Sequence, residues 1–231
     1  MINYIELNGE KSTSVKGLII QSLPPISKPK MRTSIEEING RDGDIVTKLG
    51  YAAYDKEVSV GLHGDFDIDD AIAFFDSEGE VVFGNEPDKY YRYQILDQID
   101  FERLVRFRTA KVKMHVQPFK YDAVDRVFEA VGQKSVTLRN RGNVSSRPTV
   151  TVYGSGSVEL AINSVTVMTM AIGDGYITID AEEMNARHGD ALMNRSVSGD
   201  YSDVRLSVGE NVISCSGDVT GITVEDYSRW L

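Results

Sequence analysis

Apolar and polar side chains alternate strictly over residues 57–62, which is typical of a strand with one buried face. Val58, Val60 and Leu62 occupy the apolar positions. Upstream, residues 39–44 read Asn-Gly-Arg-Asp-Gly-Asp and separate residues 32–38 from residues 45–51. Because Gly, Asn and Asp tolerate a positive φ, this run marks a tight turn, and the sequence predicts a β-hairpin.

A helical pattern begins at Asp67, which is suited to the N-cap position. Asp69 and Asp70 fall in the first turn, where the helix dipole favours negative charge. Gly79 is expected to cap the C-terminus, and residues 81–83 to begin the next strand. The apolar residues recur at i, i+3, i+4 and i+7 and predict one buried face, formed by Ile68, Ala71, Ile72 and Phe75.

Residues 90–99 and 104–116 are predicted to form two further strands. In the second, the apolar positions change from odd numbers, as at Val105, to even numbers, as at Val112. A β-bulge near residues 108–110 would explain this slip. We expect Pro118 to end the strand, since proline cannot donate a hydrogen bond to the ladder.

After Pro118, short apolar segments recur at roughly ten-residue spacing, with glycine-rich turns between them, and this rhythm predicts an antiparallel β-sandwich. We place a domain boundary near residue 123, which gives domains 1–122 and 123–231. The chain is thus expected to be mainly β with one α-helix. The predicted strands are 135–138, 149–153, 158–162, 165–170, 176–179, 204–206, 211–216 and 221–224, and the predicted turns include 154–156, 173–175, 199–200 and 209–211.

Composition narrows the classes of function. With 231 residues, of which 41% are hydrophobic, the chain can bury a sizeable core without metals or disulfides. The single cysteine, Cys215, is expected to be a small buried hydrophobe. A net charge of −10 argues against a nucleic-acid binder, which would carry a basic balance. No apolar run suits a signal peptide or a membrane helix, so we expect a protein made in the cytosol, without membrane contact.

Candidate chemistry is sparse, and the sequence predicts neither an enzyme nor a cofactor. The histidines His63, His115 and His188 lack the spacing of metal ligands and are expected at the surface or at strand edges. The alternating carboxylates of residues 65–69 resemble a calcium loop, but helix capping explains the same residues. Residues 154–156 read Gly-Ser-Gly without the lysine of a phosphate loop, so a hairpin turn is expected there.

A basic stripe stands out in this acidic chain, and it leads into His115. One interpretation is a solvated strand face. The other is a possible subunit interface that complements an acidic patch on a neighbour, near residues 65–70 or 36–37. The stripe consists of Arg103, Arg106, Arg108, Lys111 and Lys113.

Read in order, several segments resemble the distal tail protein (Dit) family of long-tailed bacteriophages. No single segment is specific, whereas the ordered set at these spacings is, and it covers nearly the whole chain. The segments are Gly-Arg-Asp-Gly at 40–43, Pro-Asp-Lys-Tyr-Tyr at 87–91, the strand 112–121, Asn-Arg-Gly at 140–142, and residues 147–154, 177–180 and 208–213.

The resemblance implies a tail-tube-like β-sandwich or split barrel with one α-helix, followed by a galectin-like β-sandwich. It also implies a homohexameric ring in the virion tail tip, assembled in the host cytoplasm. Such a ring joins the tail tube protein to the tail-associated lysin, tail fibre or baseplate proteins, and DNA passes through without specific binding. We expect the basic stripe to face away from that channel, because lumenal cations would hold phosphates.

The alternative function is a carbohydrate-binding module in the second domain, which would aid adsorption to the host surface. Sugar sites commonly stack an aromatic ring on the C–H face of the sugar. The second domain offers only a few aromatic residues for that purpose, namely Tyr153, Tyr176, Tyr201, Tyr227 and Trp230.

Overall fold

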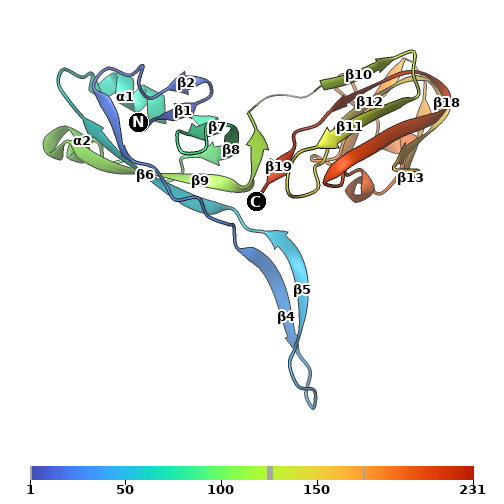
Figure 1. The fold of residues 1–231 in the computed structure, drawn as a ribbon, viewed down its shortest axis with the longest axis horizontal. Helices are drawn as coiled ribbons and strands as arrows, with labels where there is room; N and C mark the ends of the chain where they lie inside the picture. Colours follow the sequence, from blue (N-terminus) through green and yellow to red (C-terminus); the bar gives the residue numbers. More distant parts are fainter. Residues whose placement is uncertain (1, 124–126, 174) are drawn as a thin grey trace. The chain divides into compact units, whose positions relative to one another are not determined.

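The computed structural model describes residues 2–123, 127–173 and 175–231. The chain divides into two compact units (Figure 1). The first comprises residues 1–123 with residue 231, and the second comprises residues 124–230. As predicted, the chain is mainly β, and each unit has its own hydrophobic core.

Strands β2, β1, β7, β8, β9, β6 and β3 form the main sheet of the first unit, in that order. Its core contains Val58, Val60 and Leu62, as the alternation predicts. The elements are β1 Ile5–Leu7, β2 Glu10–Lys11, β3 Leu18–Ser22, β4 Met31–Glu37, β5 Asp44–Tyr51, β6 Tyr54–Leu62, α1 Ile68–Phe75, β7 Glu78–Phe83, β8 Lys89–Gln94, α2 Phe101–Phe107 and β9 Thr109–Asp122.

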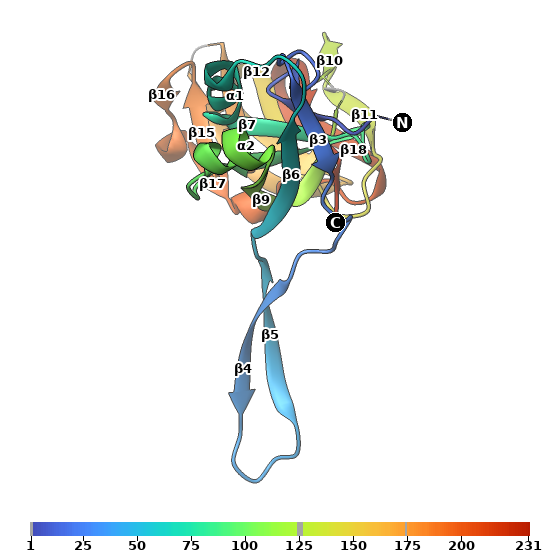
Figure 2. The ribbon, with the colours of Figure 1, turned by 90° about the vertical axis from the view of Figure 1, so that its left-hand side faces the viewer.

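The predicted hairpin is present as β4 and β5, which form a separate two-stranded sheet. It projects from the rest of the first unit, as Figures 1 and 2 show. We call residues 26–51, which comprise this hairpin and the segment leading into it, the arm. The prediction of a tight turn within residues 39–44 is confirmed, with Gly40 and Gly43 both at positive φ.

Helix α1 begins as predicted: Asp67 is the N-cap, and its side chain accepts a hydrogen bond from the backbone N–H of Asp69. Phe75 is buried, but Ile72 is 38% exposed, so the predicted burial of Ile72 is wrong. The helix is only two turns long, and Phe74 takes the buried position instead. Gly79 is not the C-cap either. The helix ends at Asp76, and Gly79 lies within β7.

The predicted strand over residues 104–116 is wrong in its first half. Residues 101–107 form a second helix, α2, whose N-cap is Asp100 and whose C-cap is Arg108 in the left-handed conformation. The change of parity therefore marks the end of a helix, and the expectation of a single α-helix is also corrected. Pro118 does not end β9. It lies between Val116, which pairs with Tyr93, and Lys120, which pairs with Tyr91. The register between β8 and β9 shifts at this point, so the ladder does not need the backbone N–H that proline lacks.

The second unit is an antiparallel sandwich built around the long strands β12 and β18. One half of β12 pairs with β14 and the other with β13, while β18 pairs with β12, β10 and β11. The strands are β10 Val127–Val131, β11 Ser135–Asn140, β12 Thr149–Ile162, β13 Val165–Ile172, β14 Tyr176–Asp180, β15 Asn185–His188, β16 Ala191–Leu192, β17 Val197–Gly199, β18 Gly209–Glu225 and β19 Arg229–Trp230.

Three predictions fail in this unit, the first two because β12 and β18 run without interruption. Residues 154–156 are not a hairpin turn, since they lie inside β12 where its register against β18 shifts. Residues 211–216 and 221–224 likewise belong to one strand. Leu206 makes only an isolated bridge to Ser146, so residues 204–206 are not a strand. The turn predicted at residues 173–175 lies partly outside the described residues.

Candidate interaction site

The structure distributes the basic stripe over two elements of the first unit. Arg103 and Arg106 lie on α2, and Lys111 and Lys113 lie on β9. Arg108 stands between them, with its guanidinium carbon 4.3 Å from the centre of the Phe66 ring. The premise that these residues share one strand is therefore wrong, while their role at a subunit interface stays a prediction.

The lysines of the stripe have acidic partners within their own chain. The Lys111 Nζ lies 2.6 Å from a Glu57 carboxylate oxygen. The Lys113 Nζ lies 2.9 Å from Asp55 and 3.0 Å from Asp97. The hydrogen bond from Lys113 lowers the pKa of Asp55. These pairs join β6 to β9 at the surface, so much of the positive charge on this face is already balanced.

The arm is the most exposed part of the first unit. Its strands pair only with each other among the described residues, and five of its large apolar side chains are exposed to solvent. The exposed fractions are 59% for Ile26, 59% for Ile35, 47% for Ile38, 55% for Val46 and 55% for Leu49.

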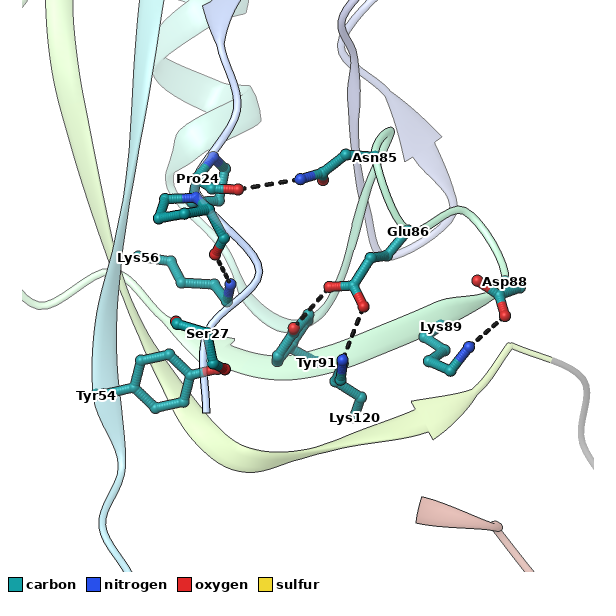
Figure 3. A network of polar contacts seen from close by, with 11 residues as sticks. Pro24, Ser27, Tyr54, Lys56, Asn85, Glu86, Asp88, Lys89, Tyr91 and Lys120 are labelled. Atoms are coloured by element: carbon teal, nitrogen blue, oxygen red, sulfur yellow. Dashed lines mark hydrogen bonds and ion pairs between the residues drawn. The ribbon is translucent and has the colours of Figure 1, made fainter. Parts of the chain in front are cut away.

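A buried polar network lies where the arm leaves the sheet (Figure 3). The Lys120 Nζ donates to a Glu86 carboxylate oxygen at 2.8 Å, and the Tyr91 hydroxyl donates to the other at 2.9 Å. Lys56 is only 3% exposed, and its Nζ lies 4.8 Å from the centre of the Tyr91 ring. Burial lowers the pKa of Lys56 and raises that of Tyr91. Glu86 thus pairs directly with the Lys120 ammonium group, and its charge also acts on the buried ammonium group of Lys56.

The same network fixes the chain segment that enters the arm. Lys56 Nζ donates to the carbonyl oxygen of Pro25 at 2.9 Å, and the Asn85 amide donates to that of Pro24 at 3.0 Å. The Tyr54 hydroxyl donates to the carbonyl oxygen of Ser27 at 3.4 Å. Side chains of β6 and of the loop between β7 and β8 therefore satisfy the carbonyl groups of a segment without regular structure, and they fix the chain where it enters the arm.

This network was not predicted from the sequence, although the strand parity of its lysines carries a signal. Lys56 has the same parity in β6 as the buried Val58 and Val60, and Lys120 has the parity of Val112 and Val116 in β9. Extending the alternation by one or two pairs places both lysines on the buried face. A buried lysine requires a carboxylate or another acceptor, and this requirement points to a partner such as Glu86.

In the second unit, aromatic rings gather on β12, β14 and β15. The Tyr153 and Tyr176 ring centres are 5.6 Å apart, and those of Tyr176 and His188 are 4.3 Å apart in a stacked arrangement. Tyr153 is 39% exposed. The three rings form an aromatic group that the spacing of the residues in the sequence does not reveal.

Three of the remaining candidate residues have structural roles. Asp65 pairs with Lys16, His115 Nδ1 lies 2.8 Å from Asp55, and Cys215 is buried. The described residues contain no group of three or more His, Cys, Asp or Glu that could hold a metal ion. None of the described helices is long and apolar enough to cross a membrane.

The fold of this chain matches that of a solved phage protein along its whole length. The crystal structure of the Dit protein of phage SPP1, described as a paradigm of the hub adsorption apparatus in phages that infect Gram-positive bacteria, aligns with a TM-score of 0.63. The identity is 16%, and 100% of each chain is covered. This chain has the Dit fold. The resemblance drawn from the sequence motifs is thereby confirmed at the level of the fold.

A second solved structure is more distant. The baseplate of phage P2 in its activated conformation with Ca aligns with a TM-score of 0.42 at 10% identity, covering 97% of this chain and 98% of the other. No protein-family model and no curated protein sequence matches the chain.

Proposed function

We propose that this chain is a structural protein of a phage virion, the distal tail hub. Six copies form a ring at the tail tip, which joins the tail tube protein to the baseplate and the tail-associated lysin. The protein assembles in the host cytoplasm, and DNA crosses the ring without being held. The proposed role is structural and not enzymatic.

The observation that carries this proposal is the full-length likeness to SPP1 Dit. Both units align, and no part of either chain is left over. Fold alone does not fix function. Here, however, the match along the whole chain and the ordered sequence motifs point to the same family.

Charge supports the proposed passage of DNA. The chain carries a net charge of −10, and Lys111 and Lys113 are paired with carboxylates of their own chain. The net negative charge of such subunits repels phosphate groups, and a lysine already paired with a carboxylate gains less from counterion release on binding DNA than a free one. We expect purified protein to bind duplex DNA poorly at physiological salt.

The test is negative-stain electron microscopy of the full chain at high concentration, alone and with its tail tube protein. A ring with a central hole, or an added cap at the end of tube particles, is the expected result. A protein that stays monomeric under both conditions, with no binding to the tube protein, overturns the proposal.

A second candidate function is carbohydrate binding by the second unit, and the aromatic group Tyr153, Tyr176 and His188 favours it. Sugars with a flat C–H face stack on such rings. A glycan array probed with the full chain and with Tyr153→Ala tests this candidate. Specific binding that the substitution abolishes supports it, whereas an array with no specific signal for either protein rejects it.

A further inference from the structure

The arm has the properties of a surface that is covered by another molecule. An isolated two-stranded hairpin is marginally stable in water at best. Ile35 and Val46 are register partners at its centre, and each is more than half exposed. Among the described residues, no further strand pairs with β4 or β5, so both outer edges keep their hydrogen-bonding groups.

Charge is segregated along the arm. The root, comprising residues 26–34 and 47–51, carries four basic residues and no acidic one: Lys28, Lys30, Arg32 and Lys48. The tip, comprising residues 35–46, carries one basic residue, Arg41, and four acidic ones: Glu36, Glu37, Asp42 and Asp44. All nine of these side chains belong to exposed residues. Each end also exposes an isoleucine, Ile26 at the root and Ile38 at the tip.

At the tip, two negatively charged side chains face each other across the hairpin. Glu37 lies directly opposite Asp44 in the register of the hairpin, and like charges in opposite positions destabilise a strand pair. The root of the same arm cannot relieve it, because a seven-residue strand at about 3.3 Å per residue separates the two ends by roughly 20 Å. Figures 1 and 2 show the tip well away from the rest of the first unit.

We propose that the acidic tip of one arm binds the basic root of the arm in a neighbouring copy of this chain. The inference rests on the proposed ring, because it names the contact between its subunits. Ile38 packs at the neighbour's Ile26, and the tip carboxylates face Lys28, Lys30 and Arg32 of the partner copy. Tyr54 holds the root at Ser27, and Lys56 and Asn85 fix the two prolines that precede it.

Disulfide trapping tests the contact even where affinity is low. Two proteins are made in a Cys215→Ser background, one with Ile38→Cys and the other with Ile26→Cys. Mixed under mild oxidation, they should form a cross-linked heterodimer at least tenfold faster than Ile38→Cys mixed with Val131→Cys. The last residue is 86% exposed and lies in the second unit, so it reports random collision.

Charge reversal on each of the two proteins distinguishes a specific electrostatic contact from nonspecific association. Glu36→Lys with Glu37→Lys on the Ile38→Cys protein should reduce trapping to the control rate. Lys28→Glu with Lys30→Glu on the Ile26→Cys protein should do the same. Mixing these two reversed proteins restores opposite charge and should recover trapping. Because the charges are exposed, trapping should also weaken at about 1 M salt, where the screening length is about 3 Å.

The results of these experiments test the tip-to-root contact and the proposed hub separately. Trapping at the control rate, or trapping that charge reversal leaves unchanged, overturns the tip-to-root contact. Rings seen by microscopy without this trapping leave the proposed hub standing and remove only the inference. Trapping that follows the charges, in a protein that forms no ring and binds no tube protein, keeps the contact and removes the hub.

Discussion

Glu86 is the residue on which the buried network of the first unit depends, and Glu86→Gln is the most direct way to test it. The substitution keeps the shape and an acceptor for the Tyr91 hydroxyl but removes the charge. Lys120, whose side chain is 10% exposed, and Lys56, at 3%, would then share a buried site without a carboxylate. Breaking a buried ion pair in this way costs about 3–5 kcal/mol, a large share of the roughly 5–15 kcal/mol that a domain has.

The assay is denaturant unfolding of the full chain, read by hydrogen exchange in peptides of β6, β8 and β9. Glu57→Gln is the matched control, because it makes the same change at a half-exposed carboxylate paired with Lys111. It should cost less than about 1 kcal/mol. Adding Lys120→Met to Glu86→Gln should recover more than half of the loss. Equal losses for Glu86→Gln and Glu57→Gln would refute the assigned role of the network.

Three further predictions concern packing, backbone and pH. Phe75→Ala should cost about 3–5 kcal/mol and Ile72→Ala less than half as much, because only Phe75 is fully packed; chemical denaturation compares them. Gly154→Ala should cost about 1–3 kcal/mol, since a Cβ there would lie 2.1 Å from a backbone oxygen, whereas Gly173→Ala, with open space around it, should be near neutral by the same measurement. Burial holds the pKa of Lys56 below its ordinary 10.5, so between that lowered pKa and 10.5 the unfolded chain binds more protons at this residue, and the contribution of Lys56 to stability rises with pH. In unfolding titrations across this window, the stability of the wild type should therefore rise with pH relative to that of Lys56→Met.

The sequence was sufficient for elements whose pattern is local and periodic. The alternation through Val58 and Val60, the glycine turn of the arm and the Asp67 cap each follow from a few neighbouring residues. Helix α2 was missed because its only fully buried residue is Leu104, so that a seven-residue helix shows no apolar stripe. The continuity of β12 was missed because Gly154 is normally a turn signal. Here it allows close approach of the Asp218 carbonyl where the register shifts.

The candidate site, too, was predictable from the sequence only in part. The chain's basic residues near 103–113 are visible in the sequence, but their division between α2 and β9, and the carboxylates that balance Lys111 and Lys113, depend on pairing between distant segments. The buried lysines were in principle readable from strand parity. Their common partner was not, because Glu86 lies in a loop whose position is fixed only once β7, β8 and β9 have paired.

Charge segregation in the arm also bears on how this protein avoids the wrong assembly. A long exposed hairpin with two free edges and apolar side chains is a template for edge-to-edge association. Stacking two arms in register would place the root of one against the root of the other and tip against tip, with like charges facing at both ends. Only a staggered or reversed contact brings Glu36 and Glu37 to Lys28 and Lys30. A staggered tip-to-root contact joins different surfaces of neighbouring copies, so it closes into a ring when the rotation per copy permits, whereas a reversed pair of arms is complete within a dimer. The residues that favour the proposed contact are therefore the same ones that oppose fibre-like stacking.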